Sequence, residues 1–192
     1  MDQFEYVVVL TSLILGLGIA QILTGIADVI SNFRNTKLYL PHTLFVIFIF
    51  LLHIQDWWIN YEYANVVESW TLKVVLLLLA YPIALFIMAR MIFPTGLRSA
   101  ETDFKQYYID QWRYLFIIGS STVVLSILHN SIISEMPLSM QLPQFAYLLT
   151  YIVFIVSKTN NHWAHLAFQS ITFLGIVIYI LTDMRMLDSY MP

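Results

Sequence analysis

Residues 70–93, WTLKVVLLLLAYPIALFIMARMIF, decide the fold class, because this stretch is apolar over almost all of its length. A bilayer core about 30 Å thick needs about 20 apolar residues in a helix. A transmembrane β-strand would instead alternate apolar and polar residues over about ten positions. The unbroken run therefore predicts a membrane-spanning helix, and Pro82 is expected to kink it near its middle.

Five further segments have the same character, at residues 5–31, 38–58, 114–134, 140–157 and 163–184. Of the 192 residues, 59% are hydrophobic and only 11% are charged, whereas soluble domains carry about 25% charged residues. The connections between the segments are too short to form an aqueous domain. The sequence therefore predicts an all-α polytopic membrane protein, with one integral membrane domain over residues 1–192 and a bundle of six transmembrane helices.

The connection before residues 114–134 differs from the others because it is amphipathic. Phe104, Tyr107, Tyr108 and Trp112 recur at helical spacing, with charged residues between them. Aromatic side chains concentrate at membrane interfaces, and amphipathic helices lie there. We therefore expect a short interfacial helix between the third and fourth spans, with its aromatic face anchored in lipid.

The nine Lys and Arg residues predict the orientation of the chain, because basic loops stay on the cytoplasmic side. One predicted side of the membrane holds Arg34, Lys37, Arg90, Arg98, Lys105, Arg113 and Lys158. The other side holds only Lys73 and Arg185. Both termini are therefore expected outside, in a plasma membrane or a bacterial inner membrane. The chain has no cysteine, which excludes disulfides and iron–sulfur clusters, and its net charge of −3 predicts no nucleic-acid partner.

Polar and small residues form rows on three of the predicted helices. The rows are Thr11, Gly18, Gln21, Gly25 and Asp28; Gly119, Thr122, Ser126 and His129; and His162, His165, Gln169, Thr172, Tyr179 and Asp183. Such rows allow membrane helices to pack closely and to bond across their seam. We expect these three helices, with the end of the helix over 38–58, to face a shared interior, while the helices over 70–93 and 140–157 lack such a face.

The stretch LLHIQDWWINYEY, residues 51–63, places ionisable groups where a helix should still lie in lipid. His53 and Asp56 are three residues apart and share a face, and His129 and Asn130 should reach a similar depth on another helix. The sequence predicts a polar cluster of these four residues near the outer leaflet. Two interpretations stay open. The cluster is an ion, proton or solute site, or it is a structural Asp–His pair that holds two helices together. Gln21 is a further candidate for the binding path.

The remaining histidines suggest two other kinds of site. His42, His162 and His165, with Asp28, should gather at the inner surface as solvated helix ends. Metal candidates are His53, His129, His162 and His165, although neither the HxxH pair at 162–165 nor the HxxD pair at 53–56 supplies a third ligand. A b-type haem would need paired histidines at equal depth, such as His53 with His129 and His42 with His165.

These patterns favour a small channel- or transporter-like protein over an enzyme, since the chain carries no catalytic motif. Titratable groups between polar helix faces could relay protons or hold a cation. A six-helix chain leaves little room for a pore, so a homo-oligomer is expected to form in the bilayer. The alternatives are a non-catalytic membrane scaffold or subunit that binds a partner protein, and an electron-transfer protein with haem b.

Overall fold

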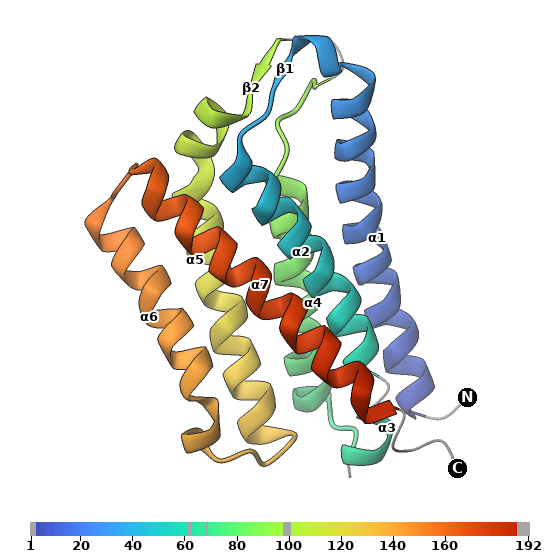
Figure 1. Ribbon diagram of the computed structural model, residues 1–192. Helices are drawn as coiled ribbons and strands as arrows, with labels where there is room; N and C mark the ends of the chain where they lie inside the picture. The colour runs from blue at the N-terminus through green and yellow to red at the C-terminus, as the bar shows by residue number, and fades with distance from the viewer. Residues whose placement is uncertain (1–2, 61–62, 68, 98–100, 188–192) are drawn as a thin grey trace.

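The computed structural model describes residues 3–60, 63–67, 69–97 and 101–187 (Figure 1). In this part of the chain, six helices are long and apolar enough to cross a membrane. They are α1 (Gln3–Ser31), α2 (Leu40–Ile59), α4 (Leu72–Met91), α5 (Phe104–Ile132), α6 (Leu142–Ser157) and α7 (His162–Leu187). The all-α class and the six apolar helices are thereby confirmed.

The long helices run up and down between two ends of a bundle (Figure 1). The α3 end carries the short helix α3 (Tyr63–Val66), the start of α1 and the end of α7. The opposite, β end carries a 3₁₀ turn η1 (Phe33–Asn35) and the strands β1 (Thr36–Lys37) and β2 (Thr102–Asp103). A second 3₁₀ turn, η2 (Leu138–Gln141), leads into α6.

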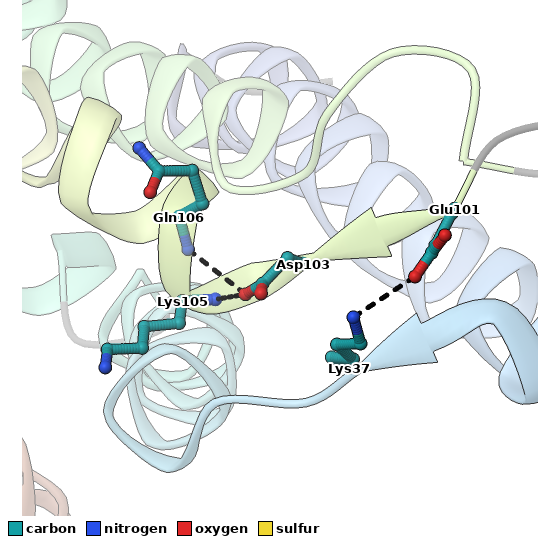
Figure 2. A network of polar contacts seen from close by, with 5 residues as sticks. All are labelled: Lys37, Glu101, Asp103, Lys105 and Gln106. Atoms are coloured by element: carbon teal, nitrogen blue, oxygen red, sulfur yellow. Dashed lines mark hydrogen bonds and ion pairs between the residues drawn. The ribbon is translucent and has the colours of Figure 1, made fainter.

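The two strands are parallel, with Thr36 opposite Thr102, and they fasten the α1–α2 connection to the start of α5. Lys37 Nζ lies 3.2 Å from Glu101 Oε1, an exposed ion pair beside the strands (Figure 2). Asp103 then caps α5, because its side chain accepts from the backbone N–H groups of Lys105 and Gln106 at 2.8 and 3.2 Å. A capping aspartate satisfies donors that a helix start leaves without partners, so α5 begins here.

The predicted interfacial helix is instead the first part of α5, which continues unbroken from Phe104 to Ile132. Its aromatic face packs inward, since Phe104, Tyr108 and Trp112 are each 1% exposed. His42 of α2 stacks on Phe104 with ring centroids 4.5 Å apart. The expectation of a lipid anchor for these residues is therefore corrected, because protein partners cover them.

Pairwise packing also differs from the expected shared interior of α1, α5 and α7. α1 packs mainly on α4, α7 lies across α2, and α5 lies between α4 and α6. The main core cluster runs through all six long helices, with Ile22 contributed by α1, and Phe45, Phe116 and Met88 are fully buried. The polar rows of α1 and α5 therefore face different neighbours, because α2 and α4 lie between these two helices.

Candidate functional site

In four of the five histidines, a ring nitrogen forms a hydrogen bond with a backbone carbonyl oxygen. The bonded atom pairs are His42 Nε2 and Ile92 O at 2.8 Å, His53 Nδ1 and Ile49 O at 2.7 Å, His129 Nε2 and Leu77 O at 2.7 Å, and His165 Nε2 and Thr159 O at 2.9 Å. A carbonyl oxygen only accepts, so the bonded ring nitrogen carries the proton in each case. These bonds assign most of the histidines a packing role that the sequence pattern does not reveal.

Among the described histidines, only His53 has a second ring nitrogen that is buried without a hydrogen-bond partner. The side chain is fully buried, and Nε2 makes no hydrogen bond. The ring lies against Gly18 of α1, where a Cβ atom would overlap Nε2. Since Nδ1 donates to Ile49, Nε2 carries a lone pair and acts as an acceptor. A buried acceptor without a donor costs about 1–3 kcal/mol.

Asp56 lies one turn further along the same face of α2 and is also buried, at 8% exposed. Its carboxylate oxygen Oδ2 makes no hydrogen bond. Tyr81 of α4 lies close enough to Asp56 for the two groups to interact electrostatically. The His53–Asp56 pair therefore presents two buried acceptors, Nε2 and Oδ2, neither of which has a hydrogen-bond donor among the residues that the structure describes.

His129 lies on α5 and binds α4 through the Leu77 carbonyl. Pro82 leaves the neighbouring Leu78 carbonyl without its helical donor, so the backbone is opened at this turn of α4. The ring centroid of His129 lies 6.0 Å from that of Tyr81. In the described part of the chain no hydrogen bond joins His129 or Asn130 to His53 or Asp56, and a shared role for these four residues stays a prediction.

Gln21 lies on α1 about one turn beyond Gly18, the residue that touches the His53 ring. It lines a cavity of about 220 Å³ between α1 and α4, toward the β end, together with Asp28, Arg90 and Phe93. Its Oε1 atom is buried without a hydrogen-bond partner. The role of Gln21 in a binding path stays a prediction.

The histidines at the start of α7 are bonded into the β end. Burial raises the pKa of the Tyr39 hydroxyl, which keeps its proton and lies 3.0 Å from His162 Nδ1. His165 Nδ1 accepts from the Tyr108 hydroxyl at 2.9 Å, and the same hydroxyl oxygen accepts from Gln169 at 3.3 Å. His165 is buried rather than a solvated helix end, because this network surrounds it.

The predicted metal and haem ligands gain little support from this geometry. Within the described residues, no three His, Asp or Glu side chains come together as a metal-binding group. The haem pairs would require His42 and His129 to release the carbonyls that their Nε2 atoms hold, and His165 to leave both of its partners. Metal and haem binding therefore stay predictions from sequence.

A cavity of about 260 Å³ lies between α2, α4, α5 and α6, and although most of its lining surface is apolar, we call it the polar cavity for the hydrogen-bonding side chains that border it. Its hydrogen-bonding side chains include Gln55, Tyr81, Thr122, Ser126, Gln144 and Tyr147. Tyr151 also lines it and rests on Gly119, where a Cβ atom would meet the phenol ring at 2.9 Å. The side chains of α6 were missed in the sequence, although Gln144, Tyr147 and Tyr151 follow the i, i+3, i+7 spacing of one helix face.

Comparisons with known proteins find no relative of this chain. No protein-family description matches it, no curated protein is detectably similar, and no solved structure resembles it. The fold and the buried polar groups define its class as a six-helix all-α protein with helices long and apolar enough to cross a membrane.

Proposed function

We propose that this chain is an integral membrane protein of the channel or transporter type, in which the His53–Asp56 pair binds and releases a proton. Many large apolar side chains point outward, among them Leu76 on α4, Val156 on α6 and Ile178 on α7, each more than half exposed. A soluble monomer rarely exposes apolar surface on this scale. A lipid bilayer is therefore the partner that covers these surfaces, and a plasma or bacterial inner membrane is the proposed location.

The observation that carries the proposal is that neither acceptor of the pair has a hydrogen-bond donor among the described residues. A proton on Asp56 makes the carboxyl group neutral, and a neutral group costs less in a low-dielectric interior than a bare carboxylate. Ionisable residues at such positions commonly belong to proton or ion pathways. A structural stitch would instead have both groups bonded to partners on the neighbouring helices.

A proton is favoured over a metal cation as the bound species. The pair offers two ligand atoms, whereas metal sites in proteins use three or four protein ligands, and the described residues hold no third candidate beside it. Histidine exchanges a proton near neutral pH, which suits repeated loading and release. Assembly into a homo-oligomer remains part of the proposal, because one six-helix chain leaves little room for a pore.

Proton flux into liposomes tests this function. Purified protein is reconstituted with a pH-sensitive dye inside, the outside is acidified, and K⁺ with valinomycin compensates the charge. We expect the wild type to acidify the lumen faster than protein-free liposomes, and Asp56→Asn to return the rate to the protein-free value. Asp110→Asn is the matched control, since Asp110 is exposed at the start of α5 and bonds only to Gln106 among the described residues.

Either of two results would contradict the proposal. Wild-type liposomes that acidify no faster than protein-free ones would leave the scaffold or membrane-subunit reading in its place. A full wild-type rate in Asp56→Asn would show that protons cross the protein by another route.

A further inference from the structure

We infer that the polar cavity between α2, α4, α5 and α6 is a binding site for a small, uncharged, planar ring with carbonyl oxygens, the chemistry of a quinone headgroup. This inference goes beyond the proton site and rests on other side chains. No acidic, basic or histidine side chain is among the residues that line the cavity. A charged ligand would therefore have no counter-ion there, and such a ligand is costly to bury unpaired.

Hydrogen-bond donors remain available in the cavity after the internal bonds are counted. Gln144 Nε2 gives one N–H to Ser126 Oγ at 2.9 Å and retains a second N–H, and the Ser126 hydroxyl retains its own proton. The Tyr147 and Tyr151 hydroxyls are 3.0 Å apart, and the Tyr147 hydroxyl also interacts with the Thr172 side chain, so the spare donors are those of Gln144 and Ser126. The Thr122 hydroxyl already donates its proton to the Gly119 carbonyl. Spare donors call for a ligand with acceptor oxygens.

Aromatic rings supply the apolar part of the lining. Phe48 from α2, Tyr81 from α4, and Tyr147 and Tyr151 from α6 all border the cavity. The Tyr147 and Tyr151 ring centroids are 4.8 Å apart and the rings are inclined at 62°, so the two rings present different planes to a ligand. Stacked and edge-to-face contacts favour a planar ring over a flexible polyol of the same volume.

The size and position of the cavity suit a headgroup whose tail stays outside. About 260 Å³ lies just below the 300–1,000 Å³ typical of pockets that enclose a drug-sized ligand. α6 packs mainly on α5, while α2 borders the cavity from the other side. A ligand dissolved in the bilayer could therefore enter between α2 and α6, with its apolar tail left in lipid.

Binding of ubiquinone with a single isoprenoid unit to the detergent-purified protein tests the inference. Thermal unfolding is followed at increasing quinone concentration, since a ligand of the native state raises the melting temperature once its concentration exceeds Kd, and the rise then continues with the logarithm of concentration. We expect this rise in the wild type, and affinity about fivefold or more weaker in the double variant Tyr147→Phe/Tyr151→Phe, which keeps both rings but removes both hydroxyls from the cavity. Tyr114→Phe, at an exposed site on α5, should bind as the wild type does.

A second arm separates charge from shape. Benzoate has a planar ring of similar size but carries a negative charge, and it should cause no concentration-dependent rise in melting temperature. Three results would overturn the inference, namely no concentration-dependent rise with ubiquinone in the wild type, equal affinity in the double variant, or equal binding of benzoate. Ser126→Ala, with Ser121→Ala on the exposed side of α5 as its control, provides an independent donor deletion if the double variant does not fold.

Discussion

Asp56→Asn is expected to raise the thermal stability of the protein while it removes proton flux. The wild-type carboxylate has a buried oxygen without a donor, and His53 Nε2 one turn away also lacks one. Once the wild-type pair has released its proton, it carries an unpaired buried charge, which the neutral amide avoids at every pH; the amide also brings N–H groups that an acceptor can use, so the comparison is made at a pH where the pair is deprotonated. We expect a gain of about 1–2 kcal/mol, or roughly 2–8 °C in melting temperature for a chain of this length.

The measurement is thermal denaturation of the two proteins in the same detergent, with Asp110→Asn as the control. An exposed carboxylate should change stability by about 0.5 kcal/mol or less. If Asp56→Asn melts at a lower temperature than the wild type, then Asp56 stabilises the helix packing, and the role of the pair is structural. A gain in stability with loss of function is the mark of a residue kept for activity.

Gly18→Leu is expected to lower stability strongly. A Cβ atom at Gly18 would overlap the buried His53 ring, and that ring is fixed by its bond to the Ile49 carbonyl. The side chain therefore forces α1 away from α2, and such overpacking costs about 1–3 kcal/mol or more. The expected fall in melting temperature is roughly 2–12 °C.

Gly16→Leu is the matched control on the same helix. A Cβ at Gly16 meets no atom within 4 Å, so a larger side chain has room there. Leucine also has a higher helix propensity than glycine, and stability should stay the same or rise. If Gly18→Leu melts at the same temperature as Gly16→Leu and the wild type, then α1 does not pack against His53 in this way.

Hydropathy was sufficient to predict the long helices, because an apolar run of about 20 residues has few other stable forms. The bounds of α1 and α7 agree within three residues of expectation. The start of α5 was missed by ten residues, since aromatic residues at helical spacing look alike whether lipid or protein covers them. Contacts such as those of Phe104 with His42 and Trp112 with His165 distinguish the two cases, and these contacts join distant parts of the chain.

The candidate site was predictable in part. His53 and Asp56 were singled out because ionisable residues seldom follow an apolar run, and their burial agrees with that reading. The partners of the other histidines could not be predicted, because backbone carbonyls leave no sequence signal. The Leu77 carbonyl, which lies near Pro82, accepts a hydrogen bond from His129 because α4 and α5 pack together. The sequence alone does not show which helices pack against each other.

Infrared spectroscopy of the protein in liposomes tests the central claim most directly, namely that the His53–Asp56 pair holds a proton. The C=O stretch of a protonated carboxyl group is resolved from the bands of carboxylates and backbone amides. Within the pH range in which the liposomes conduct protons, we predict a protonated-carboxyl band that shifts in heavy water, persists in Asp110→Asn and is absent from Asp56→Asn. Identical spectra for the wild type and Asp56→Asn in this region would contradict the account.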